Sequence, residues 1–367
     1  MGLLNQYSDR LAKMQREIRE NQFNGVILVP GANLRYYTAG NSILVERPFF
    51  MAVPTDGEPH LVAPTLESGP YLRSPLKIIT HSWTDSEGPS KSIREVVNQL
   101  GLNGKWGLEG NTPYRFVDAL LKFAQPQFEN AEHILQNLRS VKDAREVELL
   151  TRSAKIISKS FLRIPGMLKA GMSELELAQK IRGEMHANGA ESTPDVLVQS
   201  GPMAADGHHL ATKRKLRREE SIVIDATCTY GGYFSDITRT FMIGRDPAFE
   251  RLYENVLEAQ IEAVEASRSG VTTGSIDGAA RGCLRRNGLG MYFVHRTGHG
   301  LGLEVHEEPY IVSDGLEIIR SGMAFTIEPG AYMQGKTGIR IEDDLISTEK
   351  GSKVLTKAVP KDLGWWN

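Results

Sequence analysis

Apolar and polar residues follow two different periods along the first 137 residues. Some stretches repeat apolar residues every three or four positions, which is typical of helices, and others are short apolar runs typical of buried strands. The pattern predicts helices at residues 8–21, 91–100 and 114–124, and strands at residues 25–29, 49–54 and 60–64. Alternating strands and helices indicate an α/β layer, so we expect residues 1–137 to form a smaller N-terminal α/β domain.

From residue 138 onward, long helical patterns are separated by strand-rich stretches. Ser140 is a candidate N-cap for the first of these helices, and Ser173 with Glu176 forms a capping box for the second. Helices are predicted at residues 139–164, 173–187, 247–268 and 276–286, and strands at 194–201, 221–243, 291–297, 303–306, 322–333 and 337–348. We therefore expect residues 138–367 to form an α+β domain, an antiparallel sheet covered by helices.

The stretch 221–243 predicts a hairpin with two acids on one face. A Gly-Gly pair at 231–232 is a two-residue turn signal. That turn pairs Asp225 with Thr238, and Asp236 lies two residues farther along on the same face. Diagonal neighbours on one face are ~7–8 Å apart, so the two carboxylates can converge.

A second hairpin is predicted near the C-terminus. A three-residue loop at 334–336 places Glu328 opposite Glu342. Pro329 and Gly330 should interrupt the strand pairing at this point. Each hairpin thus sets a pair of acids on one face.

Four carboxylates at half-buried strand positions need a compensating positive charge. Any one acid alone is explained by a salt bridge or a strand end, but a cluster of four is matched by two divalent cations. His299 is the candidate fifth ligand, because glycines on both sides let the backbone approach a site closely. His295 and His306 lie in the same glycine-rich segment, which does not match a phosphate-binding loop.

These motifs resemble the pita-bread metallopeptidases, a family that includes prolidase, Xaa-Pro aminopeptidase, methionine aminopeptidase and creatinase. The resemblance is carried by residues 224–240, 295–309, 326–330 and 340–343, and it covers residues 139–360 most strongly. Residues 33–40 resemble the creatinase-type domain of the proline-specific members. The resemblance implies a C-terminal pita-bread fold preceded by a creatinase-like domain.

The resemblance also implies roles for individual residues. Two divalent metal ions would be bound by Asp225, Asp236, His299, Glu328 and Glu342; four oxygen donors and one imidazole suit Mn or Co, and Zn or Fe are compatible. Glu328 would handle the proton of the attacking water. The residues that would contact the substrate and its tetrahedral intermediate are His208, His295 and His306. Arg340 matches a family arginine beside the site, and an ion pair with Asp343 or Asp344 is its alternative role.

Three positions depart from the family pattern. Thr227 and Gly207 stand where glycine and proline are common in the family. Tyr310 stands where some prolidases have an arginine that holds the substrate's C-terminal carboxylate. The sequence therefore predicts an Xaa-Pro peptidase and leaves both dipeptidase and aminopeptidase activity open.

Two other functions compete with this interpretation. One is a metal-dependent hydrolase of a non-peptide amide on the creatinase-like fold. The other is a non-catalytic binding protein, which predicts lost ligands, whereas all five ligand positions are filled. The expected substrate is a small peptide with proline at its second position.

Composition narrows the range of partners. The formal net charge is -2, which gives no reason to expect nucleic-acid binding, and the basic run at 213–218 is expected to be a solvated loop. We expect no signal peptide and no membrane span, because no apolar run approaches ~18 residues. Two cysteines without a CxxC motif favour a cytoplasmic location. We also expect a homodimer.

A few side chains carry weaker expectations. Cys228 should pack on the face opposite Asp225, and Trp365 and Trp366 should pack locally or at a subunit contact. A substrate mouth is an alternative to ordinary surface or packing roles for Arg35, Arg47 and Trp83.

Overall fold

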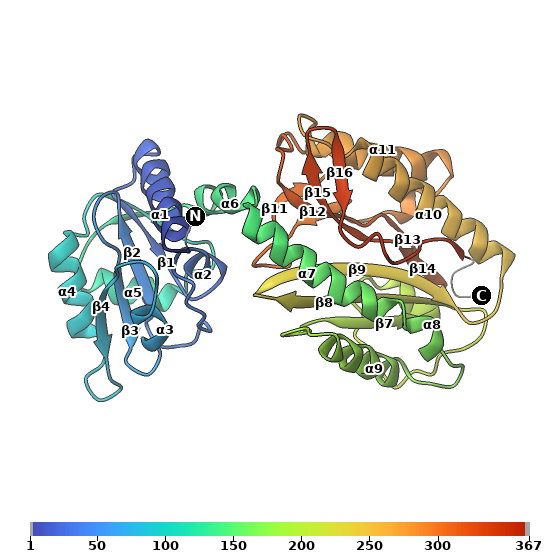
Figure 1. Cartoon of the computed structure of the whole chain (residues 1–367), viewed down its shortest axis with the longest axis horizontal. Helices are drawn as coiled ribbons and strands as arrows, with labels where there is room; N and C mark the ends of the chain where they lie inside the picture. Colours follow the sequence, from blue (N-terminus) through green and yellow to red (C-terminus); the bar gives the residue numbers. More distant parts are fainter. Residues whose placement is uncertain (1–2, 364–367) are drawn as a thin grey trace. The chain divides into compact units, whose positions relative to one another are not determined.

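The computed structural model describes residues 3–363, which form two compact units (Figure 1). The division falls between Arg139 and Ser140. The predicted domain boundary between residues 137 and 138 stays a prediction. Trp365 and Trp366 lie outside the described residues.

The first unit is built on a six-stranded mixed sheet with the order β4-β3-β2-β1-β5-β6. Its strands are Gly25–Leu28 (β1), Phe50–Pro54 (β2), His60–Pro64 (β3), Ile79–Trp83 (β4), Lys105–Leu108 (β5) and Gln127–Asn130 (β6). β1, β2 and β3 are antiparallel neighbours, whereas β4, β5 and β6 join in parallel. The first three strands were predicted. β4, β5 and β6 were missed, and β4 and β6 are largely polar.

Helices complete the α/β layer of this unit. They are Leu3–Glu20 (α1), Ala32–Thr38 (α2), Gly69–Leu72 (α3), Ser90–Leu100 (α4), Tyr114–Leu121 (α5) and Glu132–Ser140 (α6). Arg47 forms an ion pair with Asp85 at 2.8 Å, and Trp83 is buried with its indole N–H donated to the carbonyl of Pro48. These contacts are compatible with ordinary surface and packing roles, and the substrate-mouth alternative for Arg35, Arg47 and Trp83 stays a prediction.

The second unit contains antiparallel sheets. One sheet holds Val196–Ser200 (β7), Ser221–Tyr230 (β8) and Tyr233–Met242 (β9). The five-stranded sheet holds Gly298–Gly300 (β10), Glu307–Ile311 (β11), Ala324–Ile327 (β12), Asp343–Thr348 (β15) and Gly351–Val354 (β16). A two-stranded ribbon joins Gly330–Met333 (β13) to Thr337–Arg340 (β14).

Two groups of helices cover these sheets. The helices are Ala144–Phe161 (α7), Ile164–Met167 (α8), Glu174–Ala187 (α9), Pro247–Ala266 (α10) and Thr273–Arg286 (α11), with short 3-10 turns at Gly201–Ala205 (η1) and Gly290–Tyr292 (η2). Phe161 of α7 and Phe241 of β9 belong to one buried cluster, and Val256 of α10 and Phe325 of β12 belong to another. The predicted arrangement of helices over an antiparallel sheet is confirmed.

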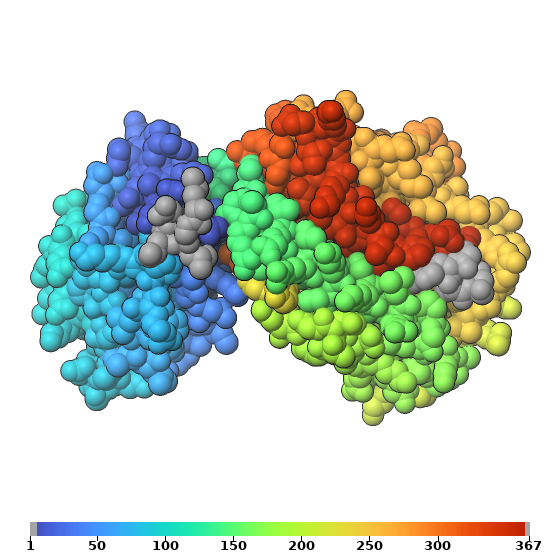
Figure 2. Space-filling model, in the orientation of Figure 1, coloured from blue at the N-terminus to red at the C-terminus, as the bar shows by residue number. Residues whose placement is uncertain are grey.

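α7 shows how a sequence pattern selects the buried face of a helix. It lies across β8 and β9 (Figure 1), and its outer face, with Arg145, Arg152, Lys155 and Lys159, is exposed on the surface of the second unit (Figure 2).

The predicted start of this helix at Ser140 is wrong. The side chain of Asp143 caps the helix instead, because it accepts from the free N–H groups of Arg145 and Glu146. The side chain of Glu146 accepts from the N–H of Asp143 in return, which completes a capping box.

Two predicted strands are wrong as well. Residues 291–297 form η2 and an irregular segment, and residues 303–306 lie in a loop that precedes β11. Both stretches are apolar enough to resemble strands. Most of their side chains are only half-buried or exposed, and neither stretch pairs with a neighbouring strand among the described residues.

β10 lies unusually close to both of its neighbours. A Cβ atom added to Gly298 would lie 1.9 Å from the carbonyl oxygen of Thr326, and one added to Gly300 would lie 2.3 Å from that of Glu308. The two glycines therefore allow the backbones of β11 and β12 to approach β10 closely. This close packing fixes His299 between the two neighbouring strands.

Replacing Gly298 by alanine should therefore separate β10 from β12. We expect Gly298→Ala to lower the free energy of unfolding by more than about 2 kcal/mol, because the backbone must move. Gly278→Ala is the matched control, since its added Cβ meets nothing within 4 Å in α11. That control should gain about 0.5–1 kcal/mol in denaturant unfolding. Equal stability of the Gly298 variant and the parent would contradict this account of β10.

Candidate functional site

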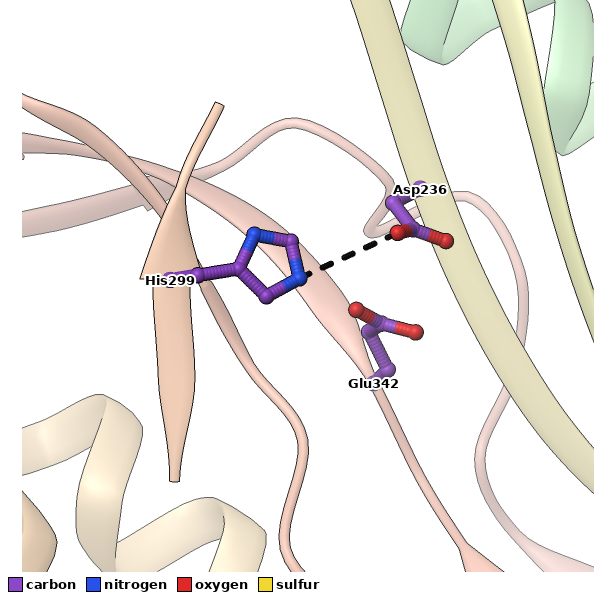
Figure 3. A group of neighbouring side chains, drawn as sticks. All are labelled: Asp236, His299 and Glu342. Carbon is purple, nitrogen blue, oxygen red and sulfur yellow. Dashed lines mark ion pairs between the residues drawn. The ribbon is translucent and has the colours of Figure 1, made fainter. Parts of the chain in front are cut away.

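The second unit brings the predicted metal ligands together from separate strands. Asp225 is on β8, Asp236 on β9 and His299 on β10. Ligand atoms of Asp236, His299 and Glu342 lie within 4.8 Å of one another (Figure 3). Nε2 of His299 is 3.3 Å from Glu328 Oε1 and 3.9 Å from Asp236 Oδ2.

Strand register sets the positions of the acids. The β8–β9 ladder pairs Asp225 with Thr238 and Thr227 with Asp236, so the predicted register of the first hairpin is confirmed. The carboxylates of Asp225 and Asp236 therefore face the same side of the ribbon.

The second hairpin has an interruption where the acids lie. The β13–β14 ribbon begins at Gly330 paired with Arg340, and the β12–β15 ladder ends at Ile327 paired with Asp343, in the same register. Glu328 and Glu342 occupy the gap between the two ladders. Their N–H groups donate to the carbonyls of Thr297 and Thr238 instead of to each other's strand. The predicted interruption of the strand pairing at Pro329 is confirmed. Glu328 and Glu342 are therefore positioned by hydrogen bonds to Thr297 and Thr238 and not by pairing with each other.

The tautomer of His299 follows from its hydrogen bonds. Nδ1 lies 3.0 Å from the carbonyl oxygen of Gly300, which can only accept, so Nδ1 carries the proton. Burial lowers the pKa of His299 to about 3, which keeps the ring neutral. Nε2 therefore presents a lone pair toward Asp236 and Glu328. A lone pair directed at carboxylates is stabilised by a cation between them.

The buried acids repel one another. Burial raises the pKa of Asp236 well above its usual range, and Glu342 and Asp225 raise it further. Burial also raises the pKa of Glu342, with Glu328 as the next cause, and it raises the pKa of Glu328 to about 7. A cluster of this kind is costly unless its charge is neutralised.

These residues fit bound divalent cations. Oδ1 of Asp236 is buried and has no hydrogen-bond partner among the described residues. The cluster offers carboxylate oxygens and one neutral imidazole nitrogen, which is a donor set for Mn, Co, Zn or Fe. An unpaired buried oxygen, a free imidazole lone pair and an excess of negative charge all point to the same ligand class.

Arg340 does not form the ion pair expected as its alternative role. Its Nη2 donates to Asp225 Oδ2 at 2.6 Å, and its Nε donates to Thr238 Oγ1 at 3.1 Å. Asp343 is bound by Arg239 instead, and Asp344 accepts from Ser235. Arg340 thus neutralises one acid of the cluster and fixes its orientation.

Tyr332 connects this arginine to His295 and was missed from the sequence. Its hydroxyl accepts from Arg340 Nη1 at 2.8 Å and lies 2.9 Å from His295 Nε2. Nδ1 of His295 lies 2.7 Å from the carbonyl of Arg296, so Nε2 is the acceptor and Tyr332 donates to it. A signal existed: Tyr332 lies diagonal to Arg340 on the face of the predicted hairpin. Gly330 leaves room for this contact, since an added Cβ would lie 2.6 Å from the tyrosine oxygen.

All nine predicted site residues border one pocket of about 760 Å³ in the second unit. His306 stacks edge to face against His299, with ring centroids 4.2 Å apart. His208 is exposed at the pocket, in the segment that follows η1. The pocket places the predicted metal ligands and the predicted substrate-contacting histidines around one space.

Features set aside in the sequence have local explanations. Arg214 of the basic run pairs with Glu220 at 2.6 Å, and Lys215 pairs with Glu176 at 3.3 Å. Cys228 is buried beside Ser153, as expected for packing. None of the described helices combines the length and apolar character needed to cross a bilayer.

Comparison with known proteins gives the same picture. Residues 148–349 match the model of metallopeptidase family M24, and residues 10–141 match the creatinase/prolidase N-terminal domain. A probable dipeptidase PepE of Mycobacterium tuberculosis is 36% identical over 362 residues, covering 97% of this chain and 96% of the relative. An Xaa-Pro dipeptidase of Pyrococcus furiosus is 33% identical over 353 residues, with coverage of 95% and 98%.

A solved structure extends the likeness to three dimensions. A recombinant prolidase from Thermococcus sibiricus superposes with a TM-score of 0.90 at 35% identity, covering 95% of this chain and 96% of that one. The predicted family and fold class are therefore confirmed. The chain belongs to metallopeptidase family M24, and its first unit is the creatinase/prolidase N-terminal domain.

Proposed function

We propose that this metallopeptidase hydrolyses the peptide bond between an N-terminal residue and proline. The observation that carries the proposal is the convergence of Asp236, His299 and Glu342 in the pocket that Asp225 and Glu328 also border. The names of the relatives, Xaa-Pro dipeptidase and prolidase, supply the substrate class. Hydrolysis of a non-peptide amide is the alternative.

We propose that one divalent ion is held by Asp225, Asp236 and Glu342. The second ion is held, or bridged to the first, by Asp236, His299, Glu328 and Glu342. Mn or Co is the first choice, with Zn and Fe compatible. A bound pair of such ions would lower the pKa of a coordinated water toward ~7 and polarise the scissile carbonyl. The protein's part is to fix the ligands, and the hydrogen bond from Thr238 to Glu342 Oε2 at 2.7 Å does so for one of them.

The remaining residues are proposed to handle the proton and the substrate. Glu328 takes the proton of the attacking water, since its carboxylate lies beside His299 and borders the pocket. His208, His295 and His306 contact the substrate and its tetrahedral intermediate. Since both ring nitrogens of His295 are already hydrogen-bonded, donors to the oxyanion that develops at the carbonyl come from His208 and His306. Arg340 holds Asp225 in position through its ion pair.

We also propose a cytoplasmic location and a homodimer. Both cysteines are buried thiols, which suits a reducing compartment. Light scattering of the purified chain measures the oligomeric state directly.

Metal binding should depend on Asp236. We expect Asp236→Asn to lose at least one of two bound Mn equivalents, because an amide is a much weaker ligand of similar shape. Elemental analysis after Mn loading and dialysis counts the ions. Asp314→Asn is the control, since this aspartate is exposed and does not border the pocket. Two bound ions and full activity in Asp236→Asn would refute the ligand assignment.

The substrate class can be tested with the Mn- or Co-loaded protein. We expect cleavage of Xaa-Pro dipeptides or Xaa-Pro-Yaa tripeptides, and much slower cleavage of Xaa-Ala counterparts, measured by release of the first residue. A non-peptide amide such as creatine serves as the comparison substrate. Absence of cleavage of every Xaa-Pro peptide, with metal bound, would refute the proposal.

Tyr332→Phe should lower kcat/KM by roughly tenfold or more, because Arg340 and His295 each lose a hydrogen-bond partner worth about 1–3 kcal/mol. Tyr253→Phe is matched to it, since this buried hydroxyl donates to the carbonyl of Lys361 away from the pocket. Both variants should lose similar stability in denaturant unfolding, but only the Tyr332 variant should lose activity. Parallel losses of activity would show that the Tyr332 contact is merely structural.

A further inference from the structure

The pocket has an uneven distribution of charge. Among the described residues that border it, the permanent cations are Arg296 and Arg340. Arg340 is buried and bound to Asp225 and Tyr332, so its charge is already matched. Arg296 has no such partner: no acidic side chain lies within ion-pair distance of it among the described residues. One arginine at the pocket is therefore available to an anionic ligand.

Arg296 is held in a defined plane. Its guanidinium carbon lies 4.4 Å from the centroid of the Tyr310 ring, which stacks beneath it. An arginine stacked on an aromatic face keeps its N–H groups directed outward in the plane of the fork, where they can bind a carboxylate with two parallel hydrogen bonds. The half-buried guanidinium thus combines free donors with restricted motion.

The backbone that carries Arg296 is also fixed. Arg281 of α11 donates to the carbonyls of Phe293 and His295, at 3.0 and 2.9 Å. Asp277 pairs with Arg281 and accepts from Thr297 Oγ1 at 2.8 Å. The residues on both sides of Arg296 are therefore tied to one helix. The preceding residue is His295, so the anchored arginine lies directly beside the proposed substrate-binding histidines.

We propose that Arg296, held against Tyr310, binds the free C-terminal carboxylate of the substrate and so makes this chain a dipeptidase. The inference rests on the proposed Xaa-Pro peptidase function and decides between its two forms. A dipeptide carries its C-terminal carboxylate on the proline that follows the cleaved bond. A longer peptide has a neutral amide at that point and leaves the arginine unmatched.

The volume of the pocket alone does not decide between a dipeptide and a longer peptide. A pocket of about 760 Å³ admits peptides longer than a dipeptide. The charge of Arg296 does decide between them, because a site built for a charged group rejects an analogue that lacks the group. Tyr310 occupies the position where some prolidases have their carboxylate-binding arginine, and here its ring positions the arginine of the neighbouring segment.

The test compares a free acid with its own amide. We would measure kcat and KM of the Mn-loaded full chain on one Xaa-Pro dipeptide, on its C-terminal amide and on the Xaa-Pro-Yaa tripeptide. The parent should prefer the free acid by roughly ten- to a hundredfold in kcat/KM. Arg296→Met should remove that preference by raising KM for the free acid, and it should change the amide little. Arg268→Met, at an exposed arginine outside the pocket, is the control.

Variants of Tyr310 test the stacking. Tyr310→Phe retains the ring and should retain the preference for the free acid, whereas Tyr310→Ala should weaken it through KM. Equal losses for acid and amide in Arg296→Met would overturn the inference, as would a parent enzyme without preference. In both cases Xaa-Pro cleavage itself would stand. A parent that cleaves no Xaa-Pro peptide would overturn the proposed function and this inference together.

Discussion

The central constraint on this fold is the repulsion among carboxylates placed inside paired strands. Asp236 and Glu342 are buried, with Glu328 and Asp225 close by, and burial raises the pKa of the first two well above the usual range of an acid. Cations are the direct way to stabilise such a cluster, and one arginine balances only Asp225. The surrounding strands hold these acids at positions where a metal can bind.

The positions of the acids are set by the registers of the paired strands and by close contacts between their backbones. The interruption between β12 and β13 turns Glu328 away from a regular ladder, and the glycines of β10 let His299 lie between two backbones. Thr238 and Arg340 then orient Glu342 and Asp225. Glu342 and Asp225 are therefore fixed by neighbours on other strands, and His299 by the carbonyl of Gly300, which is the second layer of contacts that is typical of metal sites.

The sequence was sufficient for those parts that depend on local rules. The Gly-Gly turn and the two-residue period of strands placed Asp225 opposite Thr238, and a three-residue loop placed β13 against β14. It failed where distant segments decide. Residues 291–297 have the composition of a strand, but Arg281 and Asp277 of α11 hold them in an irregular path. The start of α7 was misplaced because Ser140 and Asp143 are both acceptable caps, and the second is better supported by Glu146. The link between Tyr332 and His295 also joins residues 37 positions apart.

A second group of ligand-type side chains, Glu258, Glu262 and Cys283, lies between α10 and α11, so the position of bound metal is itself informative. Metal binding by the pocket acids is tested most directly by anomalous diffraction from crystals of the Mn-loaded protein. We expect two Mn peaks ~3.5–4 Å apart, both in contact with Asp236 and Glu342, and one of them with His299. A single peak, or Mn bound at Glu258 and Glu262 with the pocket acids uncoordinated, would contradict this expectation.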